Sequence, residues 1–290
     1  MDYHHDRFDD HSLMIFKADQ LMAVLPANIV GEVLHSHQGL SYGGLVLSKA
    51  IRFNEVLEVF KSILKSLNEA NISTLSIKQI PSIYHRLPAD EIDYLIQQVN
   101  GQIMRCDVAA VVRNERAMPI ESSNRIRGLK RARQNELVVT EVSDLADFWQ
   151  NILEPNLVLR HEAKPTHTAS EIELLKNRFP ENIRQFNVYH NENLVGGATV
   201  FETDEVAHVQ YISANEDRQR LGSLDILFHE LMTKFKSKTY FDFGISNEES
   251  GTKVNDGLLR WKEDFGARVI AHRFFEIETK YYVQLENILK

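Results

Sequence analysis

The feature of this sequence that most constrains its fold is an order of strands and helices that is predicted twice. Hydrophobic periodicity predicts strand, helix, strand, helix and strand in each half of the chain. The strand "TLSIKQI" at 74–80 corresponds to "YFDFGIS" at 240–246, and a second pair of strands begins near residues 102 and 268. Both displacements are roughly 166 residues, within the uncertainty of such boundaries. Because several elements share one displacement, we interpret the chain as a structural tandem repeat.

The two copies are predicted to be unequal. Only the second copy begins with an additional strand and two helices, over about 135–180. The predicted fold class is therefore α/β (α+β), with two mixed central sheets flanked by helices and a first domain that lacks its leading strand and helices. We expect a truncated domain over 1–119, a basic connector over 120–134 and a complete domain over 135–290. Because the first sheet lacks a strand, its edge near residues 13–25 needs a cover, either the acidic N-terminal tail or a partner subunit.

The connector "SSNRIRGLKRARQNE" concentrates positive charge in an acidic chain of net charge −8. Two interpretations stay open, a solvated helix between domains or an electropositive wall for a phosphate-bearing substrate. Its basic residues are Arg125, Arg127, Lys130, Arg131 and Arg133.

Composition excludes several classes of protein. The one cysteine, Cys106, rules out a disulfide framework and a cysteine-based zinc site. We expect no metal, since His35 and His37 lack an evident third ligand. No apolar run approaches the roughly 20 residues of a membrane helix, and "MDYHHDRFDD" is no signal peptide, so we expect a cytoplasmic protein without a membrane span. Hydrolase, ATPase, metalloprotease and dehydrogenase motifs are absent from the sequence.

An acid inside a strand and a lysine on a helix stand out near the C-terminus. Alternation in "YFDFG" places Tyr240 and Asp242 on one face of a strand. A carboxylate there is costly unless it is paired. It is interpreted either as a structural partner or as a general base. Lys262 lies on the following amphipathic helix, where its residue pattern alone is that of a solvated lysine.

The segments "YFDFGIS" and "NDGLLRWKEDFGA" resemble the C-terminal signature of Fem-like proteins, the peptidoglycan-bridge aminoacyltransferases and their relatives of the GNAT superfamily of acyltransferases. "LPANIVGEVLHSHQGLSYGGLVL" and "IPSIYHRLPADEIDYLI" resemble the first domain of that group. "PTHTASEIELL" and "AHVQYISANEDRQRLGSLDILF" resemble its second domain. The resemblance covers nearly the whole chain and implies tandem GNAT-like domains, an acceptor side in the first and a donor side in the second.

The resemblance also implies a site in the second domain. In this fold two neighbouring parallel strands part, and the arm of an acyl donor lies between them; here these strands are about 205–213 and 240–246. The helix that starts near Gly222 offers unpaired N–H groups to a pyrophosphate. Gln219 and Gly222 match the family's pyrophosphate loop, whereas Leu224 stands where the family has Gly or Ala. The expected catalytic residues are Lys262, Asp242 and His208, and the expected cofactor-binding residues are Tyr211, Ile212, Ser213, Asn215, Arg218, Gln219, Gly222 and Ser223.

The predicted function is an N-acyltransferase that moves an acyl group from acetyl-CoA or another acyl-CoA to an amine of a sugar nucleotide or another cell-envelope or polysaccharide precursor. Two alternatives stay open, a Fem-type transferase that uses aminoacyl-tRNA and a non-catalytic binding module with the same fold. The expected partner is a small-molecule amine, with tRNA and a homo-oligomer as further options. The expected substrate-binding residues are His37, Tyr42, Lys78, Tyr84, His85, Arg127 and Arg131.

Overall fold

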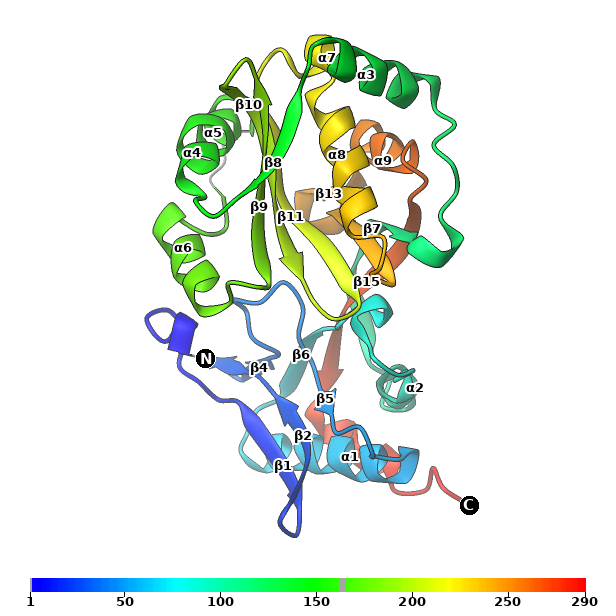
Figure 1. Ribbon diagram of the computed structural model, residues 1–290. Helices are drawn as coiled ribbons and strands as arrows, with labels where there is room; N and C mark the ends of the chain where they lie inside the picture. The colour runs from blue at the N-terminus through cyan, green and yellow to red at the C-terminus, as the bar shows by residue number, and fades with distance from the viewer. Residues whose placement is uncertain (1, 162–164) are drawn as a thin grey trace. The chain divides into compact units, whose positions relative to one another are not determined.

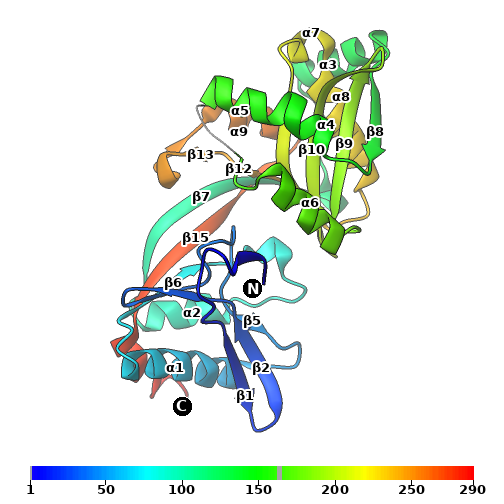
Figure 2. The same cartoon turned by 90° about the vertical axis from the view of Figure 1, so that its left-hand side faces the viewer.

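The computed structural model describes residues 2–161 and 165–290, which form two compact units. The first unit comprises residues 1–107, 247–253 and 271–290, and the second comprises residues 108–246 and 254–270. Two long strands, β7 (Gln102–Arg113) and β15 (Arg268–Glu278), each contribute residues to both units. The order of elements along the chain follows the colours of Figure 1, and Figure 2 shows the same ribbon from the side.

The first unit packs a mixed sheet on a long amphipathic helix. In helix α1 (Phe53–Glu69), the buried residues Val56, Phe60, Ile63, Leu64 and Leu67 recur at spacings of three and four, which gives the helix one apolar face. This face shares a core with the inward residues of the sheet, whose strand order is β3-β4-β6-β15. The other elements of the unit are η1 (Asp2–His4), β1 (Leu13–Lys17), β2 (Gln20–Leu25), β3 (Asn28–Val30), β4 (Val33–His35), β5 (Val46–Leu47), β6 (Thr74–Lys78), η2 (Ser82–Tyr84), α2 (Glu91–Gln98) and η6 (Thr279–Leu285).

The second unit has a sheet with helices on both faces. Its strand order is β7-β12-β11-β10-β9-β8. The strands are β8 (Val138–Val142), β9 (Ile183–His190), β10 (Asn193–Glu202), β11 (Val206–Ala214) and β12 (Tyr240–Ile245). One face carries α4 (Ala146–Phe148), a π-helical turn (Trp149–Leu153), α5 (Glu154–His161) and α6 (Ala169–Arg178). The other face carries α3 (Ser123–Gln134), α7 (Arg218–Leu221), α8 (Ser223–Lys234) and α9 (Asp256–Glu263). Short elements complete the chain: η3 (Asn114–Arg116), β13 (Asn247–Glu248), η5 (Glu249–Gly251) and β14 (Lys253–Val254).

The predicted repeat is visible in the strand pairing, with the last strands exchanged. In the first unit β4 pairs with β6 in parallel, and in the second unit β11 pairs with β12 in parallel. Strand β6 is then followed along the sheet by β15, the last strand of the second copy, whereas β12 is followed by β7, the last strand of the first copy. Consequently residues 108–119 lie in the second unit and residues 271–290 in the first, which differs from the domain boundaries predicted at 119 and 135.

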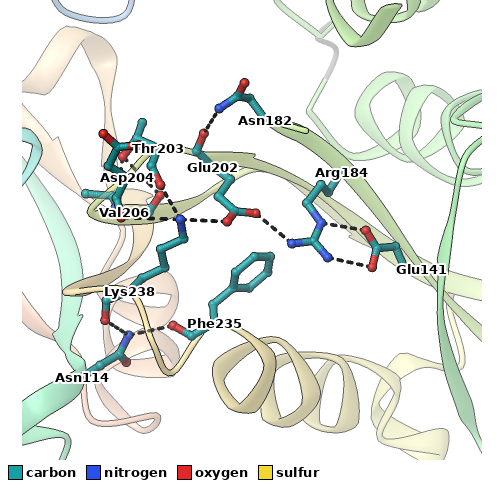
Figure 3. A network of polar contacts seen from close by, with 10 residues as sticks. All are labelled: Asn114, Glu141, Asn182, Arg184, Glu202, Thr203, Asp204, Val206, Phe235 and Lys238. Carbon is teal, nitrogen blue, oxygen red and sulfur yellow. Dashed lines mark hydrogen bonds and ion pairs between the residues drawn. The ribbon is translucent and has the colours of Figure 1, made fainter. Parts of the chain in front are cut away.

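A network of ion pairs connects three strands of the second unit (Figure 3). The Arg184 guanidinium donates to both carboxylate oxygens of Glu141 at 2.6 and 2.8 Å and to Glu202 at 2.8 Å. Lys238 Nζ lies 2.8 Å from a Glu202 oxygen, and the Asn114 amide donates to two carbonyls of the connection between α8 and β12. Hydrogen bonds from Arg184 lower the pKa of Glu141 to about 2. The network fixes the strand ends without using the residues of the predicted site.

The exchange of strands predicts that the second copy does not fold alone. A fragment of residues 135–290 lacks the strand that pairs with Phe241 and Asp242, and its own residues Phe274–Glu278 lack β6. Unpaired strand edges with apolar side chains favour aggregation. We expect this fragment to aggregate or to give an NMR spectrum without dispersion, while the full chain unfolds cooperatively. A folded, monomeric fragment of 135–290 would show that β7 is dispensable.

Candidate functional site

Two neighbouring strands of the second unit, β11 and β12, are paired only over their first residues. The parallel pairing of β11 with β12 joins Val206 to Tyr240, Ala207 to Phe241 and His208 to Asp242, and ends there. Strand β11 continues to Ala214, and along this stretch it remains paired with β10 on its other edge. The backbone edge of β11 beyond His208 is therefore left without β12 as a partner, as expected for strands that part.

Irregularities in both strands explain why the pairing stops. Opposite β10, strand β11 has one additional residue, Gln210, between Val209 and Tyr211. Opposite β7, strand β12 has one additional residue between Asp242 and Ile245, where Gly244 adopts φ +75°. Such bulges bend a strand and increase its twist locally. Because both bulges follow the last shared pair, the strands diverge immediately beyond His208 and Asp242.

A hydrogen bond between the two last paired residues marks the point of divergence. His208 Nδ1 lies 2.9 Å from Asp242 Oδ2, where the carboxylate accepts the ring proton. The other carboxylate oxygen, Oδ1, accepts the Gly244 N–H at 2.7 Å. Asp242 is buried, whereas the His208 side chain is 19% exposed, and its Nε2 lies 3.2 Å from Gln210 Oε1. Asp242 therefore orients the imidazole and sets its Nδ1–H tautomer.

Lys262, on helix α9, contacts β12 close to the His208–Asp242 pair. It lies on α9, where the neighbouring Trp261 and Phe265 pack on the aromatic core around Phe228. Its side chain is only 4% exposed, and Nζ donates to the carbonyls of Gly244 at 2.9 Å and Ile245 at 2.6 Å. Burial lowers the pKa of Lys262 to about 8, against the opposing attraction of the Asp242 carboxylate. An ammonium has three donors, so one remains for a further acceptor.

Three predicted cofactor-binding residues lie on the diverging part of β11. Tyr211 is buried on the same face of the sheet as His208, because the additional residue Gln210 shifts the alternation of β11. Its hydroxyl accepts the His167 N–H at 3.2 Å, and its ring contacts the ring of Trp149 edge-on. Ile212 is half-buried and borders the apolar core on the side of α8. The Ser213 hydroxyl accepts from the Asn156 amide of α5 at 2.9 Å. Tyr211 and Ser213 thus connect β11 with the helices behind it.

The predicted pyrophosphate loop satisfies its own backbone. The N–H groups of Arg218, Leu221 and Gly222 donate to the carbonyls of Asn215, Asp217 and Arg218 respectively. Residues 218–221 form the short helix α7 in place of an open glycine-rich turn. Arg218 is half-buried and Gln219 is exposed. A phosphate site needs backbone N–H groups that converge on the ligand, and here these three amides already donate within the loop.

The connector helix α3 covers the start of α8. A Cβ on Gly222, which has φ +78°, would lie 2.2 Å from the Gly128 carbonyl oxygen, and a Cβ on Gly128 would lie 2.0 Å from Asp225 Oδ2. Asp225 is buried in the first turn of α8, with its carboxylate 2.7 Å from Arg125. Burial raises the pKa of Asp225, although Arg125 opposes this. Ser223 is fully buried. The start of α8 thus holds a buried carboxylate and is covered by α3.

The predicted acceptor residues of the first unit fall into separate groups. The rings of Tyr42 and Tyr84 lie together, with centroids 4.7 Å apart. Lys78 Nζ donates to the carbonyls of Gln38 and Leu40 at 2.8 and 2.9 Å, and burial lowers its pKa. His37 is buried against the ring of His4, at 4.8 Å.

His85 is half-buried directly after η2. The remaining two predicted residues, Arg127 and Arg131, belong to the second unit and are exposed on α3. Within the first unit, Tyr42 and Tyr84 contact one another.

Several residues of the site were not predicted from the sequence. Gly244 accepts from Lys262 through its carbonyl and donates to Asp242 through its N–H. Gln210 is the additional residue of the bulge in β11. The Ser246 hydroxyl, directly after β12, is fully buried and has no hydrogen-bond partner among residues 2–161 and 165–290. The glycine after "YFDF" was the only sequence signal for this turn, since a strand glycine suggests a bulge.

Comparison with solved structures identifies the architecture. L-PGS from Bacillus licheniformis is 12% identical, with a TM-score of 0.62 over 94% of this chain and 88% of that one. FemX is 10% identical, with a TM-score of 0.60 over 96% and 90%. A tandem GNAT protein from the clavulanic acid biosynthesis pathway is 11% identical, with a TM-score of 0.52 over 94% and 85%. The chain has a tandem GNAT fold. The fold expected from the sequence resemblance is thereby confirmed.

Sequence comparisons add nothing to this likeness, since no family model and no curated protein matches the chain. None of the helices described for residues 2–161 and 165–290 is both long and apolar enough to cross a membrane.

The close approach of α3 to α8 predicts that Gly128 and Gly222 are required for stability. Alanine at either position places a Cβ against a carboxylate or a carbonyl, and overpacking typically costs about 1–3 kcal/mol. We expect G128A and G222A each to lower the free energy of unfolding in urea by that amount. G257A is the matched control, because a Cβ there meets nothing closer than 3.6 Å. Unchanged stability of G222A would instead leave this glycine free for a ligand.

The lowered pKa of Lys262 predicts a pH-dependent contribution to stability. In the unfolded chain, Lys262 releases its proton near the ordinary lysine pKa of 10.5, whereas in the folded chain it releases the proton near pH 8. The unfolded state therefore binds more protons between these values, and stability rises with pH there, by up to about 3 kcal/mol. We expect wild type to gain stability relative to K262M between pH 7.5 and 10.5 in urea titrations. A difference that does not change with pH would mean that Lys262 keeps an ordinary pKa.

Proposed function

We propose that this chain is an N-acyltransferase whose reaction centre consists of His208, Asp242 and Lys262. The hydrogen bond of 2.9 Å between His208 and Asp242, located where β11 and β12 part, carries this proposal. A buried carboxylate that fixes an imidazole is an arrangement suited to taking a proton from a nucleophile. The tandem GNAT fold supports acyl transfer as the reaction class.

His208 is proposed as the general base and Asp242 as its positioning residue. With Nδ1–H directed at Asp242, the lone pair of Nε2 is available to a proton donor. Gln210 Oε1, 3.2 Å from Nε2, can accept from the protonated ring, and after a flip of the amide the Gln210 NH₂ can donate to the neutral ring. An acceptor amine would take the place of this amide and transfer its proton to Nε2. This assignment revises the expected roles, because both Asp242 oxygens already accept hydrogen bonds, one from the His208 ring and one from the Gly244 N–H.

Lys262 is proposed to stabilise the charge that develops on the reacting carbonyl. Two of its donors are held by Gly244 and Ile245, so the ammonium is fixed at the bend of β12 beside Asp242. A fixed positive charge in a buried site stabilises an oxyanion without reorganisation. A pKa of about 8 leaves the lysine mainly charged at neutral pH.

The donor is proposed to be an acyl ester carried by RNA, one of the two donors that the sequence resemblance implies. Two observations support this choice over acyl-CoA. Backbone N–H groups of the loop at 215–222 donate within the loop, and helix α3 covers the start of α8. In the transfer, the amine nitrogen attacks the ester carbonyl and a C–N bond forms. The bond from the carbonyl carbon to the ribose oxygen then breaks, and the proton taken by His208 passes to that oxygen.

Acyl-CoA remains the second candidate donor for a specific reason. Gln219 and Gly222 occupy two positions of the pyrophosphate motif. In addition, the structure of the tandem GNAT protein from the clavulanic acid biosynthesis pathway is the form of that protein without AcCoA. The amine acceptor is proposed to belong to a sugar nucleotide or another cell-envelope precursor, a class that the resemblance implies. The paired rings of Tyr42 and Tyr84 support a ring-bearing acceptor.

A donor assay with hydroxylamine as the probe amine tests this mechanism before the natural acceptor is known. Radiolabelled aminoacyl-tRNA or acetyl-CoA is supplied, and hydroxamate formation above the uncatalysed background is measured. We expect activity with aminoacyl-tRNA, and a kcat lowered about 10²–10⁴-fold in H208Q, typical for the loss of a general base. D242N should also lower kcat, since an amide can hold the wrong tautomer.

The control is H190Q, which replaces another half-buried strand histidine of the same unit. Activity with acetyl-CoA alone would replace the donor and leave the dyad in place. Activity that H208Q, D242N and K262M all leave unchanged would refute this reaction centre. Complete inactivity with both donors would favour the non-catalytic binding module.

A further inference from the structure

The connector helix α3 has two chemically different faces. Its inner face carries Gly128 and Ala132, which are buried, and Arg125, which pairs with Asp225 and lies over the ring of Phe265 at 5.6 Å. Its outer face carries exposed cations instead. The close packing of the inner face fixes the helix, so the outer cations are held on a rigid element.

Helix α3 contacts α7 directly, and α7 carries two further cations (Figure 1). We define the α3–α7 basic surface by the residues Arg127, Lys130, Arg131, Arg133, Arg218 and Arg220. Within the part of the chain that the structure describes, no carboxylate pairs with the first four, and Arg127 donates only to the neutral Asn124 side chain. Arg220 pairs with Asp217 at 2.8 Å.

The α3–α7 basic surface concentrates positive charge in a protein whose net charge is −8. Exposed cations without carboxylate partners attract polyanions and release counterions when they bind phosphates. Helix α3 has 12 residues and is therefore about 18 Å long, which is enough to meet several phosphates of a nucleic acid rather than one diphosphate.

The surface lacks the features of a membrane-binding helix. Such helices present a broad apolar face of large side chains next to their cations. In α3, Leu129 and Ala132 pack into the core of the second unit, and only Ile126 is an exposed large hydrophobic residue, at 53%. The pattern therefore favours a nucleic acid over an anionic lipid surface.

We propose that the α3–α7 basic surface binds the phosphate backbone of the RNA that carries the acyl group. The inference rests on the proposed function for the identity of the polyanion as RNA, and on the charge pattern for the position of binding. Helix α3 thus has a double role: its inner face closes the phosphate site at the start of α8, and its outer face supplies a wider one. The cations are expected to contact phosphates only and to carry no sequence specificity.

Binding of fluorescently labelled unfractionated tRNA, measured by anisotropy between 50 and 300 mM salt, tests the proposal. The variant R127Q/K130Q/R131Q/R133Q is compared with K49Q/K65Q/K236Q/K290Q, which removes the same charge from exposed lysines elsewhere. We expect the α3 variant to bind more than 10-fold more weakly at 100 mM salt. The slope of log K against log salt should fall by about 3, near 0.7–0.9 for each lost phosphate contact. The control should stay within about 2-fold of wild type.

Other outcomes overturn the proposal. Equal losses in both variants would mean that only total charge matters. Wild-type tRNA binding by the α3 variant, with circular dichroism and urea unfolding showing that both variants fold, would place RNA elsewhere. Binding to phosphatidylglycerol vesicles but not to tRNA would assign the surface to a membrane.

The hydroxylamine assay separates this inference from the proposed function. H208Q should bind tRNA like wild type yet lose transfer, while the α3 variant should raise KM for aminoacyl-tRNA with kcat largely kept. Transfer from aminoacyl-tRNA that the α3 variant leaves intact would refute the surface and preserve the reaction. Binding of tRNA through α3 without any transfer would preserve the surface and refute the reaction.

Discussion

The hydrogen bond between His208 and Asp242 is the interaction on which the candidate site depends. It joins the side chains of the last residue pair that β11 and β12 share, and the bulges at Gln210 and Gly244 follow directly. A buried carboxylate without partners would destabilise the strand, so the ring of His208 and the Gly244 N–H make this position tolerable. The same bonds bring the imidazole, the carboxylate and the Lys262 ammonium to one place. The stability of the strand and the geometry of the candidate site therefore depend on the same group of residues.

Much of the fold could be predicted from the sequence because its signals are local. The carboxylate within "YFDFG", the capping box of Thr168 with Glu171 and the apolar stripe of α1 are each patterns within a single strand or helix. His208, Asp242 and Lys262 were all named in advance, and the structure gathers them. Their relation was not predictable, since the tautomer and the relative burial depend on a contact between residues 34 positions apart.

Two features were beyond sequence reasoning for physical reasons. The strands β7 and β15 have similar apolar patterns, so the pattern fits either sheet and cannot tell which one each strand completes. Gly222 matches a phosphate loop, yet a positive φ and a close backbone approach are needed equally for a ligand and for a crossing helix. In both cases the sequence specifies a requirement, and only the tertiary structure shows which neighbour meets it.

The exchanged strands have a consequence for the origin of the chain. If the two copies arose by duplication, a single-copy ancestor had to complete its sheet either with its own final strand or with that of a second molecule in a domain-swapped dimer. Fusion of the two genes would make such an exchange intramolecular and independent of protein concentration. Each copy was then free to diverge in chemistry, because its partner could no longer dissociate. The candidate site could thus arise in one copy alone, while each copy still depended on the strand that the other contributes.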